Sequence, residues 1–122
     1  MQKMLLSINP EHVVNILNGS KKYEFRKRKC KQPVRKIVMY ETAPTMLVIG
    51  EVDILEIIED SPEKVWSETS SFSGVNKSFF DHYYQGHDIA VAYKLGKIKK
   101  FKRPRSLSDY GLHQAPQSFA YV

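Results

Sequence analysis

The chain has 122 residues, of which 42% are hydrophobic and 26% charged, a composition typical of one folded domain and not of a disordered chain. The single cysteine, Cys30, excludes an internal disulfide, and no segment reaches the roughly 18 apolar residues of a membrane span. The first twelve residues hold no apolar run long enough for a signal peptide. We therefore expect a single domain over residues 1–122, in a cytoplasmic protein without a membrane partner.

The formal net charge is +6, and the charges are unevenly distributed along the chain. Residues 1–40 carry ten Lys/Arg and two Asp/Glu, residues 41–90 carry two and ten, and residues 91–122 carry seven and one. Sixteen of the nineteen cations lie in 21–36 and 94–105. If the fold brings these two segments together, they form one basic face suited to a phosphate backbone. The alternative is two separately solvated charge runs.

The start of the chain predicts a strand followed by a helix. Residues 3–9 form a short apolar run that indicates a buried strand. Asn9, Pro10 and Glu11 are typical of a helix start, as the cap, a proline in the first turn and an acidic residue beside it. Gly19 fits the residue just after the helix, where a positive φ is often required.

Three further strands are expected before the middle of the chain. Residues 23–30 and 35–42 predict two strands, separated by a break at Gln32-Pro33. Residues 46–58 predict a long strand, in which Gly50 indicates a bend or bulge.

The second half predicts two outer helices and a return to strands. Residues 61–86 contain two helical segments, separated by a stretch rich in Ser, Thr and Gly. Residues 89–95 alternate as a strand, 97–105 form a basic strand or loop, and the last residues of 106–122 allow an edge strand. The order of elements predicts an α+β domain with a mainly antiparallel, barrel-like sheet.

The most informative stretch follows the first helix. Gly19 gives a tight turn, Lys21 follows it, and Glu24, Arg26 and Arg28 lie on one face of the emerging strand. Lys21 offers a mobile charge for a phosphate or carbonyl, and Arg26 offers a planar fork for bidentate contact. Glu24 can hold the two cations in register or accept a base amino group. The alternative is an ordinary solvated polar face with surface ion pairs.

The pattern G-x-K-x-x-E-x-R, here Gly19, Lys21, Glu24 and Arg26, resembles the signature of the ASCH domain, and it stands just after the first helix as in that family. The opening LLSINPEHVVNILNGSKKYEFRKR, the stretch GEVDI and the ending APQSFAYV are similar to small stand-alone ASCH proteins, so the resemblance covers essentially the whole chain. It implies a PUA-like β-barrel with a cleft beside the first helix, lined by the motif's polar residues and binding RNA. Arg28 and Tyr40, an aromatic on the adjacent strand, are further candidates for that cleft.

The resemblance also implies enzymatic alternatives. One ASCH group hydrolyses the amide of N4-acetylcytidine with a lysine, a threonine and a more distant glutamate. Lys21 matches the lysine, but Glu24 stands at the threonine position, so Glu24 would act as a general base on water while Lys21 stabilises the oxyanion. Glu51 or Asp53 is a candidate second carboxylate. Another ASCH protein is a ribonuclease, whose residues do not transfer to this sequence.

The remaining residues suggest no cofactor. The four histidines, His12, His82, His87 and His113, lie at no metal-ligand spacing, and no Gly-rich phosphate loop is present. A helical cluster of aromatic residues predicts core packing: Phe79, Phe80, Tyr83 and Tyr84.

Three hypotheses about function follow. The first is an RNA-binding module in which Lys100 and Arg103 of the basic stretch help to hold the backbone. The second is an enzyme acting on a modified nucleoside or small amide, or a ribonuclease, with Lys21 and Glu24 central. The third is a protein whose basic face contacts a protein partner. The sequence does not indicate an oligomeric state.

Overall fold

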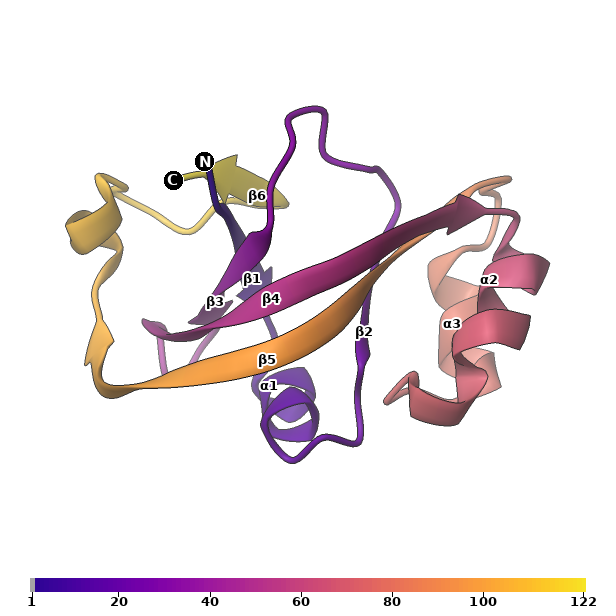
Figure 1. The fold of residues 1–122 in the computed structure, drawn as a ribbon, viewed down its shortest axis with the longest axis horizontal. Coiled ribbons are helices and arrows are strands. Elements are labelled where there is room, and N and C mark those ends of the chain that lie inside the picture. The colour runs from indigo at the N-terminus through magenta and orange to yellow at the C-terminus, as the bar shows by residue number, and fades with distance from the viewer. Residues whose placement is uncertain (1) are drawn as a thin grey trace.

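The computed structural model describes residues 2–122, which fold into six strands, three α-helices and two short 3-10 turns (Figure 1). In chain order these are β1 (Met4–Ile8), α1 (Pro10–Leu17), β2 (Tyr23–Arg26), β3 (Lys36–Glu41), β4 (Leu47–Asp60), α2 (Pro62–Thr69), η1 (Ser70–Phe72), α3 (Lys77–Tyr83), β5 (Ala90–Arg105), η2 (Leu107–Tyr110) and β6 (Phe119–Tyr121).

The six strands form one curled sheet in the order β2-β5-β4-β3-β1-β6. β1 and β3 pair in parallel, and every other neighbouring pair is antiparallel. The register on both sides of β4 shifts at Gly50, where an added Cβ would lie 2.5 Å from the carbonyl oxygen of Lys99. This close approach bends the long strands β4 and β5, which cross the whole molecule in Figure 1. The predicted α+β fold with a mainly antiparallel sheet is confirmed.

Local capping signals fix the starts of the helices. α1 begins at Pro10 after the extended residue Asn9, and Gly19 follows the helix with φ +86°. The Ser61 side chain accepts a hydrogen bond from the backbone N–H of Lys64 at the start of α2. Asn76 does the same for Phe79 at the start of α3. The Ser61 and Asn76 side chains each satisfy a backbone donor that the first helical turn leaves without a partner, whereas the Asn9 side chain makes no such bond.

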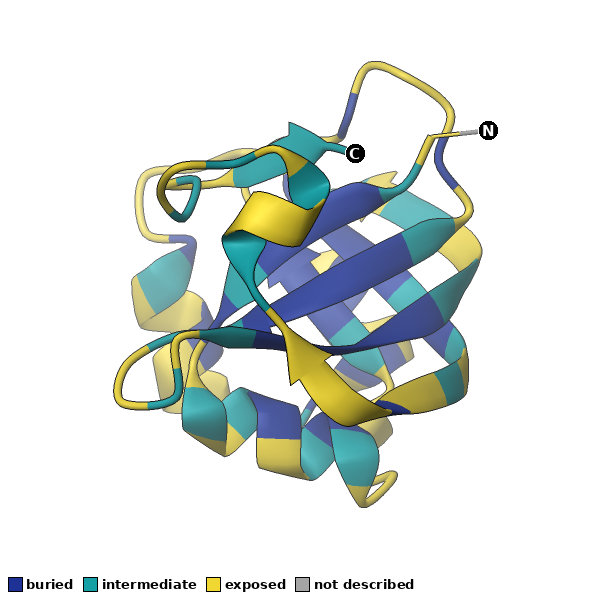
Figure 2. Ribbon diagram, turned by 90° about the vertical axis from the view of Figure 1, so that its left-hand side faces the viewer, coloured by how far each residue is buried: buried dark blue, intermediate teal, exposed yellow. Residues whose placement is uncertain are grey.

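Buried side chains form three clusters on the curled sheet, and Figure 2 shows the centre of the sheet as its most buried part. The first packs α1 onto one face and includes Leu6, Val13 and Ile16. The second packs α2 and α3 against β2 and β5 through an aromatic group around Phe80. The third lies on the opposite face around Val38, under the segment that follows β5. These helices and the final segment cover the sheet from separate sides (Figure 1).

One segment differs from the sequence prediction, and the structure decides a second that the sequence left open. β2 ends at Arg26 and not at residue 30, and the following loop is held by side-chain hydroxyls. The Tyr93 hydroxyl accepts the N–H of Cys30, at 3.1 Å. The Tyr121 hydroxyl accepts the N–H groups of Lys31 and Gln32, at 3.0 and 3.1 Å. The stretch 97–105, for which the sequence allowed a strand or a loop, continues the strand that begins at Ala90 and pairs with β4 from Ile98 to Lys100 and again at Arg105.

Strand β6 brings distant parts of the sequence together. It pairs antiparallel with β1, and the ladder continues to Lys3 and Val122, whose backbone N–H groups each donate to the other's carbonyl, at 3.1 and 2.9 Å. Among residues 2–122, no helix has the length and apolar character needed to cross a membrane.

Candidate nucleic-acid cleft

A cleft of about 190 Å³ opens between α1, β2 and α3. The end of β1 and α1 form its first wall, with Ser7, Ile8, Asn9 and His12. The sequence motif forms the second, with Lys21, Glu24, Phe25 and Arg26. The third comes from the α3 region, with Val75, Phe79 and Tyr83. The predicted motif residues and residues up to about sixty positions away therefore meet in one site.

Lys21 is held in the cleft by contacts on all parts of its side chain. The turn at Gly19 directs it inward, and its backbone N–H donates to Asn15 at 2.9 Å. The side chain is only 3% exposed, and its ammonium donates to the carbonyl of Ser73 at 2.8 Å. The ammonium also lies 4.8 Å from the centre of the Phe25 ring. Burial lowers the pKa of Lys21 below its ordinary value, although the nearby Glu24 carboxylate opposes that shift.

Glu24 and Arg26 form an ion pair on the same face of β2, as the strand parity predicts. Nε and Nη2 of Arg26 both donate to Oε2 of Glu24, at 3.0 and 2.8 Å. Nη2 also donates to the carbonyl of Ser7 at 3.0 Å, which ties β2 to the end of β1. Arg26 makes both of its bonds to the carboxylate through Oε2. Among the described residues none donates to Oε1, which can therefore accept a hydrogen bond from a ligand.

His12 is the titratable group of the cleft that sequence reasoning missed. Its side chain is 16% exposed, and its Nδ1 is buried without a hydrogen-bond partner among residues 2–122. Burial, reinforced by the nearby Lys21 ammonium, lowers the pKa of His12 below the ordinary value of 6.5. Both effects favour the neutral imidazole, although the nearby Glu24 and Glu11 carboxylates oppose them. One signal was available, because His12 lies four residues before buried Ile16 and thus on the inner face of the helix beside the motif.

The aromatic residues of α3 divide between the core and the cleft. Phe80 and Tyr84 are buried, as the sequence predicts. Phe79 and Tyr83, the other pair at i, i+4 spacing, line the cleft with parallel rings whose centres are 6.4 Å apart. The prediction that all four pack in the core is thus wrong for Phe79, which is 48% exposed. An exposed ring beside cationic groups is a surface on which a base can stack.

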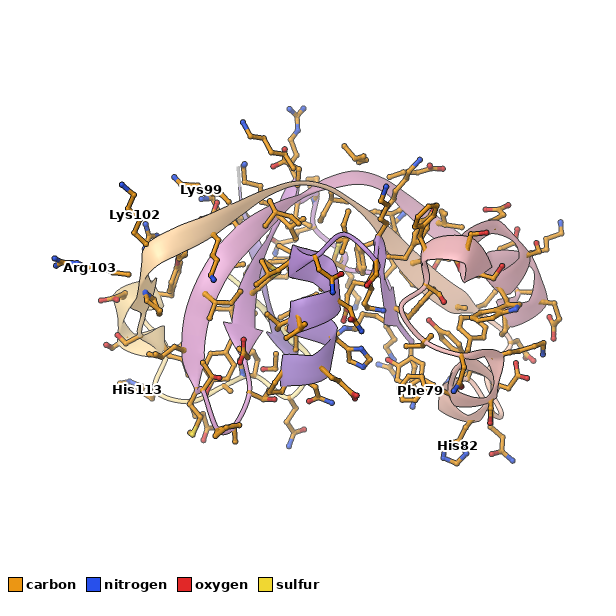
Figure 3. All side chains as sticks on the ribbon, turned by 90° about the horizontal axis from the view of Figure 1, so that it is seen from below. Phe79, His82, Lys99, Lys102, Arg103 and His113 are labelled. Carbon is orange, nitrogen blue, oxygen red and sulfur yellow. The ribbon has the colours of Figure 1, made fainter. Side chains whose placement is uncertain are left out.

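The other predicted site residues lie outside this cleft. Gly19 forms the turn before Lys21 but does not line the cleft. Arg28 is exposed in the loop after β2, and Tyr40 is 3% exposed in the third core cluster. Lys100 and Arg103 line a shallow groove along the end of β5. Figure 3 shows Lys99, Lys102 and Arg103 toward the left end of the molecule and Phe79 well to their right, beyond the centre, so this basic strand does not extend the cleft.

The two candidate second carboxylates are engaged elsewhere. Glu51 is paired with Lys3, and Asp53 with Lys36, each at 2.8 Å, and neither lines the cleft. Within residues 2–122, no group of three or more His, Cys, Asp or Glu side chains is arranged to hold a metal ion.

The curled sheet, the helix beside it and the cleft between them define a PUA-like α+β domain. The crystal structure of ASCH from Zymomonas mobilis superimposes with a TM-score of 0.86 at 26% identity, over 98% of this chain and 87% of that one. A variant of the same protein with one Tyr-to-Phe substitution gives 0.87 at 25% identity, over 100% and 91%. The chain is therefore an ASCH-domain protein.

The curated relatives differ greatly in length. An ASCH domain-containing ribonuclease of Zymomonas mobilis is 26% identical over 126 residues, which cover 99% of this chain and 84% of that protein. The ATP synthase subunit alpha and the large ribosomal subunit protein uL22 of Ureaplasma parvum are each 28% identical over 122 residues. The chain covers only 15% and 39% of those two proteins. No protein-family model matches the chain.

Proposed function

We propose that this chain is an RNA-binding ASCH domain, acting as one unit over residues 1–122, whose cleft holds a single nucleotide of a single-stranded segment. The observation that carries the proposal is the meeting of Lys21, Glu24 and Arg26 in one cleft beside the exposed Phe79 ring. Two cations against one carboxylate leave the cleft with an excess positive charge, which favours an anionic ligand.

The cleft supplies one contact for each part of a nucleotide. The Lys21 ammonium and the Arg26 guanidinium suit phosphate oxygens or a base carbonyl. The free Oε1 of Glu24 suits a base amino group, and Phe79 offers a stacking surface. A volume of about 190 Å³ is smaller than the roughly 300–1,000 Å³ of pockets that enclose drug-sized ligands. It therefore fits one base or one nucleotide better than a folded RNA element.

The relatives support an RNA-related role. The one that this chain covers over most of its length, 84%, is named as a ribonuclease. Because the chain spans less than half of the ribosomal relative, the whole activity of that protein is not carried over. Hydrolysis of an amide such as that of N4-acetylcytidine has no support from the relatives described above.

The test is titration of fluorescent single-stranded RNA with wild-type protein and the variant Lys21→Met, which keeps the buried stem and removes the charge. We expect Lys21→Met to lower affinity roughly ten-fold or more, as for a desolvated phosphate contact. Lys64→Met, at an exposed lysine on α2, is the matched control and should bind as wild type. Wild-type binding weaker than about 100 μM in low salt, the weak limit of non-specific binding, would overturn the proposal.

RNA cleavage in the same cleft is a second candidate, favoured by His12, which lines the cleft with Lys21 and whose pKa is lowered by burial. His12 would take the proton of a ribose 2′-hydroxyl as O2′ attacks the phosphorus. Lys21 would stabilise the added negative charge, and the P–O5′ bond would break as the leaving O5′ gains a proton from Lys21 or water. The products are a 2′,3′-cyclic phosphate and a 5′-hydroxyl.

Cleavage is separated from binding by comparing a 5′-labelled RNA with a strand of the same sequence whose 2′-hydroxyls are methylated. Cleavage of the first strand alone, lost in both His12→Gln and Lys21→Met, is the expected result. Cleavage that continues in His12→Gln at the wild-type rate would exclude His12 as the base.

A further inference from the structure

A second hollow lies on the other side of Lys21. It has a volume of about 530 Å³ and is formed by the end of α1, the turn before β2 and parts of β4 and β5. Apolar side chains dominate it, and two of them are among the exposed large apolar residues of the described chain: Leu55, 63% exposed, and Phe72, 47% exposed. We call it the Phe72 groove. Exposed apolar side chains gathered in one hollow mark a binding surface more often than isolated ones do.

Lys21 and the segment 72–75 form the boundary between this groove and the cleft. Lys21 lines both hollows. The Ser73 carbonyl accepts the Lys21 ammonium, and Gly74 packs against the stem so closely that an added Cβ would lie 2.5 Å from Cβ of Lys21. Phe72 lines the groove and Val75 lines the cleft. The two hollows are therefore neighbours, separated by a boundary of only a few residues.

The charges around the groove select an anionic ligand. Its lining contains three lysines, Lys21, Lys22 and Lys94, and no carboxylate. The Lys22 ammonium lies 4.6 Å from the centre of the Phe72 ring, and the Lys22 backbone N–H donates to the Phe72 carbonyl at 2.8 Å. The backbone bond holds the two residues side by side, and the ammonium lies over the ring. A nucleobase can take the place of the ammonium over the ring, while the displaced ammonium meets the phosphate.

We propose that the Phe72 groove binds the nucleotide next to the one in the cleft, with its base stacked on Phe72 and its phosphate on Lys22 and Lys94. This inference rests on the proposed function and extends it from one nucleotide to two. A purely apolar partner would leave the ammonium groups of Lys22 and Lys94 beside an uncharged surface, which is unfavourable.

The test compares uridine oligonucleotides of one, two and three residues, titrated against wild type and single variants. Wild type should gain affinity from one residue to two, and Phe72→Ala should lose roughly ten-fold for the dinucleotide while binding the mononucleotide unchanged. Phe72→Tyr keeps the ring and should restore the gain. Ile89→Ala removes an apolar side chain with the same 47% exposure outside the groove and should bind as wild type.

Photo-crosslinking locates the second base directly. A dinucleotide carrying 5-iodouridine should attach to the peptide that contains Phe72, and the crosslink should disappear in Phe72→Ala. If wild type binds RNA through Lys21 but Phe72→Ala behaves like Ile89→Ala, the proposed function stands and the groove inference falls. If no RNA is bound, both fall. Self-association that Phe72→Ala abolishes, with dinucleotide affinity unchanged, would assign the groove to a second copy of the chain and overturn the inference.

Discussion

At the scale of single residues, the cleft keeps three charged side chains in a nearly buried position. Lys21 is 3% exposed and Glu24 is 6% exposed, yet each has a partner. The carboxylate is bonded to Arg26 and the ammonium to a backbone carbonyl. Buried charges persist in folded proteins when they are paired and hydrogen-bonded in this way. The site therefore depends on all three residues together.

Removing the negative charge should destabilise the fold. Glu24→Gln leaves Lys21 and Arg26 as two like charges without a carboxylate between them, and we expect a loss of roughly 2–4 kcal/mol in the free energy of unfolding. Urea denaturation at neutral pH measures it. The control is Asp81→Asn, which breaks the exposed pair with Lys77 and should cost at most about 0.5 kcal/mol. Equal losses in the two variants would contradict the buried role of Glu24.

His12 should make stability fall in mild acid. Because its pKa lies below 6.5 in the folded protein, the unfolded chain binds more protons in the interval between the two values. Stability from this residue is therefore complete well above pH 6.5 and declines as the pH falls below it, until the folded pKa is reached. Denaturation from about pH 7.5 to about pH 5.5 should show a smaller decline in His12→Gln than in wild type.

His82→Gln is the matched control for that experiment. His82 is exposed on α3 and points away from the molecule in Figure 3. Its substitution should leave the wild-type pH dependence in place, and a flattened curve in this variant would show that the acid sensitivity does not come from His12.

The same residues show what a sequence pattern reveals. Alternation along β2 was enough to predict that Glu24 and Arg26 share a face, because strand parity is a local property. The burial of Tyr40 and the cleft position of Phe79 could not be predicted in this way. They depend on which elements cover each face of the sheet, and residues far apart in sequence decide that.

At the scale of elements, the segment between α2 and α3 forms part of the site. Gly74 has φ +71° and packs directly on the stem of Lys21. Gly74→Ala should therefore strain the backbone and also displace Lys21, with a loss of more than about 1–2 kcal/mol in stability and weaker RNA binding. Thermal denaturation and the RNA titration described above measure the two effects.

Gly86→Ala separates the backbone strain from the displacement. Gly86 has φ +80°, but an added Cβ meets no atom within 4 Å. This variant should show only the backbone cost, about 1–2 kcal/mol, with RNA affinity unchanged. If both variants bind RNA equally well, the contact between Gly74 and Lys21 does not shape the site.

The boundaries of helices and strands also differ in how far they can be predicted from nearby residues. The starts of α1 and α2 were predictable, because proline and capping residues act on the first helical turn. The ends of the strands were not. β2 stops at Arg26 and β5 continues through its basic half to Arg105, since pairing with a neighbouring strand sets the length of each.

Across the whole molecule, the cations at the end of β5 lie far from the cleft. Lys99, Lys102 and Arg103 lie toward the left end in Figure 3, and Phe79 lies well to their right, beyond the centre. A trinucleotide bound in the cleft should therefore not reach them, whereas a longer RNA should. Arg103→Ala should leave trinucleotide binding unchanged and flatten the salt dependence for an RNA of about 20 nucleotides, by roughly 0.7 in the log–log slope. Lys100→Ala should act in the same way.

Anisotropy titrations at several salt concentrations check this prediction. Arg26→Ala provides the contrast, because its loss should weaken the trinucleotide and the longer RNA alike. If Arg103→Ala and Arg26→Ala change both RNAs in the same manner, the cleft has no special role and the protein binds polyanions without a defined site.

The pairing of Lys3 with Val122 has a consequence for how such a domain is carried by other proteins. In an antiparallel pair that exchanges two hydrogen bonds, the Cα atoms lie about 5.5 Å apart. A domain whose first and last residues lie this close can therefore be inserted into a loop of another protein with little change in the course of that loop. In the two Ureaplasma relatives the matched segment makes up 15% and 39% of a longer chain, so this geometry bears on how the segment joins its neighbours there.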